Sequence, residues 1–193
     1  MKRLALLTAL LAVAATVQAA PETFIIDNSH TYPRFTYTHL GFSRQTQQFD
    51  KTSGKVVLDF ADKTGSVDVT IDATSVHTGT ALFNEHIQGE DYFYTAKYPT
   101  ITFKSSKMSF NGDEPVSLAG NLTIKGVTQP VMLAITHFKC MPHPMLKVQA
   151  CGANATATVK RSDFNMGKGV PFVGDEMSLT LVIEATKETP VTP

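Results

Sequence analysis

Histidine is the residue type in this 193-residue sequence best suited to metal or proton-transfer chemistry. Zinc sites usually pair their ligands roughly two to five residues apart in the chain. The histidines here are spread much more widely, at His30, His39, His77, His86, His137 and His143. We therefore predict no metal site, and we interpret most of these side chains as solvated or hydrogen-bonded imidazoles.

Covalent and acid–base catalysis have no recognisable residue set either. The Gly-x-Ser-x-Gly pattern is absent, and Ser43, Ser75 and Ser105 stand in no motif that would supply a base and an oxyanion hole. Glu90 and Asp91 are adjacent, which is typical of a helix start rather than of an acid/base pair. Gly-rich phosphate loops and dinucleotide fingerprints are also missing. The sequence therefore predicts a protein that is not an enzyme and that needs no cofactor.

The first residues predict export from the cell. Lys2 and Arg3 are followed by an apolar run over residues 4–15 and by the small-x-small pattern of residues 17–19. This order is that of a secretory signal peptide, which we expect to occupy residues 1–19 and to be cleaved after Ala19. Later segments lack the roughly 18 consecutive apolar residues of a transmembrane helix, so we expect no membrane span in the mature chain.

The two cysteines fit an exported protein. Cys140 and Cys151 flank a Pro-containing stretch of ten residues. In an oxidising compartment we expect them to form a disulfide, worth about 3 kcal/mol in the chain-entropy model. The alternative is a pair of buried thiols, because the two further ligands that a metal would need are not nearby. Net charge is close to zero, so no nucleic-acid partner is expected.

Apolar and polar residues alternate with a period of two through most of the chain. This pattern is typical of strands that bury one face and expose the other. Residues 35–39 and 67–73 show it clearly, and similar runs cover residues 56–60, 101–103, 118–124, 131–135, 153–159 and 177–183. Turn-forming sequences lie between the runs, at residues 62–65, 111–115 and 125–130.

These runs predict an all-β fold, an eight-stranded antiparallel lipocalin-like β-barrel with a short helical lid segment. Closing such a sheet removes its exposed edges. Residues 81–96 break the alternation with helix-like spacing, and we call them the lid segment because they could cover one mouth. We expect one domain over residues 20–186 and a flexible tail over residues 187–193. A barrel of this size is either filled by side chains or hollow enough for one slender ligand, and that difference decides the function.

Five sequence blocks, in a fixed order from about Phe24 to Ala185, match a known pattern. They lie at residues 27–43, 86–93, 98–103, 120–131 and 161–166, and include the segments DNSH, HLGFS, YPTITF, GNLTIKGVT and RSDFNM. Together they resemble the YceI-like family of polyisoprenoid-binding, lipocalin-like periplasmic proteins. The chain departs from the family at Asn84, where an Asp is common ahead of the lid histidine, and at Asn165, where a Gly is common. Asn tolerates left-handed backbone, so we expect the turn at Asn165 to survive.

The resemblance implies a barrel whose apolar tunnel holds a long isoprenoid chain of the quinone or polyprenyl type. Side chains predicted to bind it line the inward faces of the strands and the lid segment, at Phe35, Tyr37, Val67, Val69, Ile71, Phe93, Ile101, Phe103, Leu122, Ile124, Leu133 and Leu181. His39, His86 and Arg161 are expected near a mouth, where they would hold a head group or fix the lid segment. Arg161 could instead pair with Asp163 or cap a turn, and His39 could be a buried strand residue.

The sequence predicts a periplasmic carrier, reservoir or stress-protective protein that binds an isoprenoid lipid. Apolar residues in the lid segment, namely Phe83, Tyr92, Phe93 and Tyr94, would also suit a homodimer formed through the mouths. Two rival hypotheses remain open. One is an envelope enzyme that acts on a lipid or small molecule through His39 or His86, and the other is an interaction protein with a solid core.

Overall fold

A computed structural model describes residues 20–189 of the chain. The predicted signal peptide, residues 1–19, lies outside the described residues, as do residues 190–193. Within the described range, no helix has both the length and the apolar character needed to cross a membrane.

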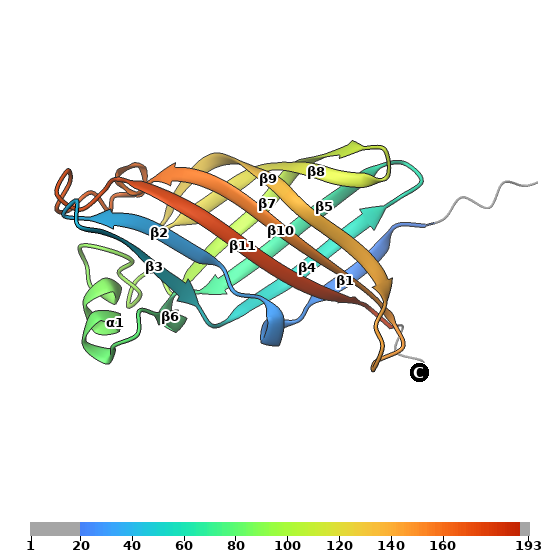
Figure 1. The fold of residues 1–193 in the computed structure, drawn as a ribbon, viewed down its shortest axis with the longest axis horizontal. Coiled ribbons are helices and arrows are strands. Elements are labelled where there is room, and N and C mark those ends of the chain that lie inside the picture. Colours follow the sequence, from blue (N-terminus) through green and yellow to red (C-terminus); the bar gives the residue numbers. More distant parts are fainter. Residues whose placement is uncertain (1–19, 190–193) are drawn as a thin grey trace, which may run out of the picture.

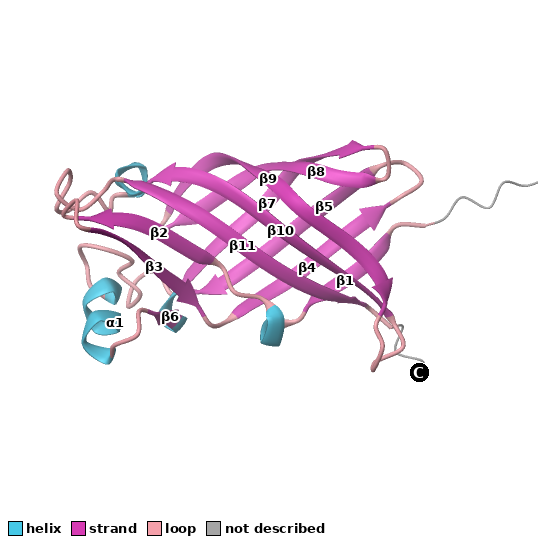
Figure 2. Cartoon of the chain, viewed as in Figure 1, coloured by secondary structure: helices cyan, strands magenta, loops and turns pink. Residues whose placement is uncertain are grey.

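Eight antiparallel strands close into a barrel, as predicted (Figures 1 and 2). Each strand pairs with the next around the wall, and pairing of the first strand with the last completes the circle. In their order around the barrel the strands are β1 (Glu22–Ile26), β4 (Thr52–Asp59), β5 (Thr64–Asp72), β7 (Thr100–Asn111), β8 (Glu114–Ile124), β9 (Val127–Pro142), β10 (Gln149–Lys160) and β11 (Glu176–Lys187). Closure leaves these strands without a free edge, which removes a site for aggregation.

Three further strands lengthen the wall at one end. β2 (Arg34–His39) pairs with the first part of β11, β3 (Ser43–Phe49) pairs with β2, and β6 (Val76–His77) pairs with β3. The 3-10 turn η1 (Asn28–His30) separates β1 from β2, and both strands run along β11. The extension is therefore a continuation of the barrel wall toward α1, on the left of Figure 1.

The lid segment begins with the helix α1 (Ala81–Gln88), so its predicted helical character holds for its first half. The Thr80 side chain caps the helix by accepting a hydrogen bond from the Phe83 amide at 3.3 Å. After Gly89 the segment continues as turns up to β7. Ile87 and Phe93 are buried, whereas Leu82 is exposed. The segment therefore packs onto the extended end of the barrel through a few apolar side chains.

The predicted disulfide is present and joins neighbouring strands. Cys140 on β9 and Cys151 on β10 lie directly opposite each other in the register. Cys151 packs with Phe24, Leu58 and Ala185 in a small buried cluster that lies apart from the main core. Full burial of a side chain such as Phe24 is worth roughly 1.5–3 kcal/mol.

The last strand runs one residue into the predicted tail. Lys187 belongs to β11, where it pairs with Phe24, and its Nζ donates to Glu22 Oε1 at 2.6 Å. The strand therefore includes the first residue of the predicted tail, because its pairing with β1 continues to Lys187.

Candidate ligand-binding site

An apolar cavity lies inside the barrel. Its volume is about 170 Å³. The side chains around it come from the lid segment, the 3-10 turn η3 (Arg161–Phe164), the strands β2 and β3, and every strand of the closed barrel except β1. Period-two alternation explains this lining, because every second residue of a strand faces the interior. Many of the predicted ligand-binding residues line this interior cavity: Phe35, Val67, Val69, Ile71, Phe93, Ile101, Phe103, Leu122, Ile124, Leu133, Arg161 and Leu181.

A second cavity of about 130 Å³ lies between the extended wall and the lid segment, and we call it the mouth cavity. Tyr37, His39 and His86 line it, together with Phe83, Ile87 and Tyr92 among others. Tyr37 was predicted to line the tunnel, but it borders the mouth cavity instead. The reason is that β2 belongs to the extension and lies beyond most of the closed barrel.

A partition of side chains separates the two cavities. Phe35, Phe93, Arg161, Met166 and Met177 line both spaces, so they form the wall between them. The Phe93 ring lies 5.8 Å from that of Phe35 at an interplanar angle of 69°. Such edge-to-face contacts add to the energy of burial. We call the Phe35–Phe93 pair, which forms the aromatic part of this partition, the aromatic plug.

Arg161 has a structural role, as the alternative interpretation of the sequence expected, but its partners are backbone carbonyls rather than Asp163. It begins the 3-10 turn η3 (Arg161–Phe164), and the residue is 4% exposed. Its N–H groups donate to backbone carbonyls of Met166, of Lys168 at 2.9 Å, of Val173 at 2.8 Å and of Gly174 at 2.9 Å. All but one of the guanidinium N–H groups are therefore used to hold residues 165–175, which we call the mouth loop.

The turn at Asn165 has the predicted geometry. Asn165 follows η3 with φ 58° and ψ 35°, in the left-handed region that Asn tolerates where a Gly is common. Its amide donates to the carbonyl of Ser162 at 3.1 Å, which closes the turn. The substitution therefore keeps the start of the mouth loop intact.

Two lysines tie the lid segment to the mouth loop. Lys125 Nζ donates to the carbonyls of Glu90 and Asn165, both at 2.8 Å. Lys168 forms an ion pair with Asp91. These contacts hold the turns after α1 against the mouth loop.

A buried tyrosine–glutamine pair lies at the mouth. Tyr37 is 7% exposed and Gln47, from the neighbouring strand β3, is 5% exposed. Burial raises the pKa of the Tyr37 phenol, and a hydrogen bond with the Gln47 side chain acts in the opposite direction. The phenol therefore stays protonated at neutral pH. Sequence reasoning missed Gln47 because it lies in the polar run of residues 43–48. Its position, two residues before Phe49, places both side chains on the inward face of β3.

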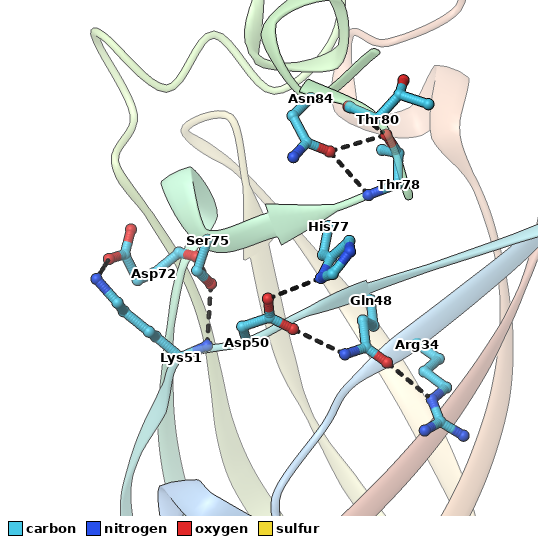
Figure 3. A network of polar contacts seen from close by, with 10 residues as sticks. All are labelled: Arg34, Gln48, Asp50, Lys51, Asp72, Ser75, His77, Thr78, Thr80 and Asn84. Carbon is cyan, nitrogen blue, oxygen red and sulfur yellow. Dashed lines mark hydrogen bonds and ion pairs between the residues drawn. The ribbon is translucent and has the colours of Figure 1, made fainter. Parts of the chain in front are cut away.

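His86 is held by aromatic neighbours rather than by the residue at position 84. Its ring lies 5.9 Å from that of Phe83 and 5.0 Å from that of Tyr92. Asn84 Oδ1 instead accepts hydrogen bonds from the Thr78 amide and hydroxyl, both at 2.8 Å (Figure 3). The Asn84 side chain therefore fixes the chain before α1.

A polar network holds the corner where β3 passes into β4 (Figure 3). Asp50 accepts from Gln48 at 2.7 Å and contacts His77 Nδ1 at 3.0 Å, and the Lys51 amide donates to Ser75 Oγ at 3.0 Å. Close to this corner, Thr52 is 3% exposed. Its hydroxyl is the one buried side-chain polar atom in the described range with no hydrogen-bond partner.

One group on the outside of the barrel has metal-ligand chemistry. Ligand-type atoms of Asp27, His30 and Glu184 lie within 4.8 Å of one another. Asp27 Oδ2 and His30 Nδ1 are 2.7 Å apart, and Ser29 donates to Asp27 Oδ1 from both its amide and its hydroxyl. Hydrogen bonds from His30 and Ser29 lower the pKa of Asp27 to about 2, and Asp27 raises the pKa of His30. We interpret the group as an ion pair that caps η1.

Comparison with known proteins bears directly on this barrel. A model of the YceI-like domain matches residues 24–185, which is most of the chain. The chain belongs to the YceI-like family. Among the relatives of this YceI-like protein, a UPF0312 protein of Ectopseudomonas mendocina is 31% identical over 89% of this chain and 91% of its own length. Protein YceI of Escherichia coli O157:H7 is 32% identical over 84% of each chain.

Solved structures show the same fold. BcnA of Burkholderia cenocepacia superposes on this YceI-like chain with a TM-score of 0.73 and 27% identity, over 83% of this chain and 99% of BcnA. A polyisoprenoid binding domain from Saccharophagus degradans superposes with a TM-score of 0.64 over 86% of this chain and 98% of its own. Because the latter is 17% identical, it supports the fold alone.

Proposed function

We propose that this YceI-like protein binds one long apolar chain of isoprenoid type inside the barrel. The observation that carries the proposal is the interior cavity of about 170 Å³, whose lining is apolar almost throughout. Such a space offers an apolar ligand no strong directional contacts, but it removes the ligand from water. Each buried CH₂ group contributes about 0.8 kcal/mol, so a chain of several isoprene units gains affinity through its length.

The cavity volumes set a condition on how such a chain fits. A cavity of roughly 150 Å³ is sufficient for benzene. The interior cavity therefore holds a short length of chain, and a longer chain also occupies the mouth cavity of about 130 Å³. To pass between the two spaces the chain must displace the rings of Phe35 and Phe93. Binding is thus accompanied by a rearrangement of the aromatic plug.

The proposed place of action is the periplasm, where the protein serves as a carrier or reservoir for its lipid. The N-terminal sequence and the disulfide between Cys140 and Cys151 support export to an oxidising compartment. The Saccharophagus neighbour, which shares the fold, is itself named as polyisoprenoid binding. A homodimer through the mouths also belongs to the proposal. Phe93, one of the residues expected at its interface, is buried, and the exposed apolar side chains are instead Leu82 on α1, Phe42 in the β2–β3 turn and Phe172 in the mouth loop.

The test fills the interior cavity without touching the mouth. Leu133 lines the cavity and is buried, whereas its neighbour Met132 faces outward and is 60% exposed. We expect Leu133→Trp to lower the affinity for a long-chain prenyl alcohol at least roughly tenfold in a fluorescence titration, which is 1.4 kcal/mol. Met132→Trp is the matched control and should bind as the wild type does. Equal affinity in the two variants would contradict the proposal.

A further inference from the structure

The mouth cavity contains the polar groups that a lipid head would meet. Tyr37, His39, His86, Tyr92 and Arg161 line it, and the rest of its lining is apolar. A chain that enters tail first leaves its head at this point. The hydrogen bonds that these side chains already make therefore limit which heads can be recognised.

Arg161 is poorly placed to bind a phosphate. Arginine usually grips a phosphate with two parallel N–H donors. The guanidinium of Arg161 instead gives its donors to carbonyls of Met166, Lys168, Val173 and Gly174, and the residue is 4% exposed. A bidentate phosphate contact would take donors away from the mouth loop, which would leave buried and part-buried carbonyls unpaired.

The two lysines near the mouth also already have partners within the protein. Lys125 donates to the carbonyls of Glu90 and Asn165, and Lys168 pairs with Asp91. Neither lysine lines the mouth cavity. Over the described residues, Arg161 is thus the one permanently charged side chain that borders this space, and a phosphate placed there would be desolvated without a dedicated counter-charge.

Tyr37 offers a group that suits an uncharged head. It borders the mouth cavity beside the aromatic plug, and burial keeps its phenol protonated. The phenol oxygen can accept a hydrogen bond from the side-chain amide of Gln47, which contacts it. In that arrangement the phenol O–H can point to a ligand oxygen, and the imidazoles of His39 and His86 can donate or accept at the same site.

We propose that the mouth selects an isoprenoid chain with an uncharged, oxygen-bearing head over one with a phosphate, and that Tyr37 donates a hydrogen bond to that oxygen. This inference rests on the proposed function, because it concerns the head of a ligand whose tail occupies the barrel. It specifies the chemistry of the head group, because the apolar interior contacts only the tail.

Three probes with the same chain test the selection: farnesol, farnesyl monophosphate and the parent farnesane hydrocarbon. Each displaces a fluorescent apolar dye from the full mature protein at neutral pH. We expect farnesol to bind at least roughly tenfold more tightly than the monophosphate. Equal or tighter binding of the monophosphate would overturn the inference but leave the proposed function standing. If none of the three, the hydrocarbon included, displaces the dye, both fail.

Two tyrosine variants locate the effect. Tyr37→Phe should weaken farnesol binding roughly fivefold, the size of one lost hydrogen bond, and should leave farnesane binding unchanged. Tyr98→Phe is the matched control, since Tyr98 packs against Tyr94 at 6.0 Å and lines neither cavity. A farnesol affinity that is the same in Tyr37→Phe and Tyr98→Phe would overturn the role of Tyr37. Equal weakening of farnesol and farnesane in Tyr37→Phe would do so as well.

Discussion

The ring of Phe93 meets the ring of Phe49 nearly edge-on, with centroids 5.4 Å apart and planes inclined by 76°. Phe93 belongs to the lid segment and Phe49 to β3, so this contact joins the lid segment to the extended wall. Phe93 also lines both cavities. One side chain thus contributes to the stability of the mouth and to the closure of the interior.

Phe93→Ala should therefore speed ligand exchange and lower stability together. We expect the dissociation rate of an apolar dye to rise at least roughly tenfold and the free energy of unfolding to fall by about 3–5 kcal/mol. Stopped-flow displacement and urea denaturation measure the two effects. Met145→Ala removes a side chain that is 81% exposed in the β9–β10 turn and should change neither. An unchanged exchange rate in a destabilised Phe93→Ala protein would show that Phe93 does not close the interior.

Thr52 and Thr31 should respond in opposite ways to the same substitution. The Thr52 hydroxyl is buried without a partner, so Thr52→Val keeps the shape and should raise stability by up to about 1 kcal/mol. Thr31 is fully buried and exchanges hydrogen bonds with the backbone of Glu184 at 3.2 and 3.3 Å. Thr31→Val should lower stability by about 1–2 kcal/mol. Urea denaturation of both variants measures the two free energies of unfolding. A decrease of similar size in both variants would refute the prediction.

The Asp27–His30 pair should make stability depend on pH in a defined window. The folded pKa of Asp27 is lowered from 3.8 to about 2, so its contribution is present above pH 3.8 and is lost as pH falls toward 2. The folded pKa of His30 is raised above 6.5, so its contribution is complete below pH 6.5 and is lost as pH rises through the raised value. The stability difference between wild type and Asp27→Asn should therefore be largest between pH 3.8 and 6.5.

An NMR titration tests the same pair directly. The imidazole of His30 should titrate above its ordinary value of 6.5 in the wild type, and Asp27→Asn should move its pKa back toward that value. A His30 titration that is the same in both proteins would show that the ion pair does not form in solution.

Loss of the disulfide should cost the free energy expected from chain entropy. A double Cys140→Ser, Cys151→Ser variant should be less stable than wild type by about 3 kcal/mol, because the covalent link restricts the unfolded chain. Reduced wild-type protein is the control and should lose a similar amount. Equal stability of oxidised and reduced wild type would argue against a stabilising role for the link.

Much of the barrel could be predicted because the pattern that produces it lies within short stretches of sequence. Alternation along a strand decides which side chains face the interior, and it placed Val69, Phe103 and Leu133 correctly around the cavity. The disulfide was predictable from compartment and spacing, and the left-handed turn at Asn165 from the tolerance of its side chain.

The organisation of the mouth could not be predicted, because it depends on contacts between distant segments. Tyr37 was expected in the tunnel, and alternation gives the face of a residue but not its height along the barrel axis. The partners of Arg161 are carbonyls of an irregular loop, which no side-chain pattern reveals. Gln47 and Phe49 lie at the end of a mostly polar segment. Their burial can be explained only when β3 is known to extend the barrel wall.

The central claim is that the barrel interior holds an apolar chain, and the lipid that accompanies the protein tests it most directly. The protein is purified gently from the envelope of its own cells, extracted with organic solvent and analysed by mass spectrometry against an equal amount of Leu133→Trp. We predict about one isoprenoid chain per wild-type molecule and much less in the variant. Extracts free of isoprenoid, from a protein that also takes up no added prenyl alcohol, would contradict the account.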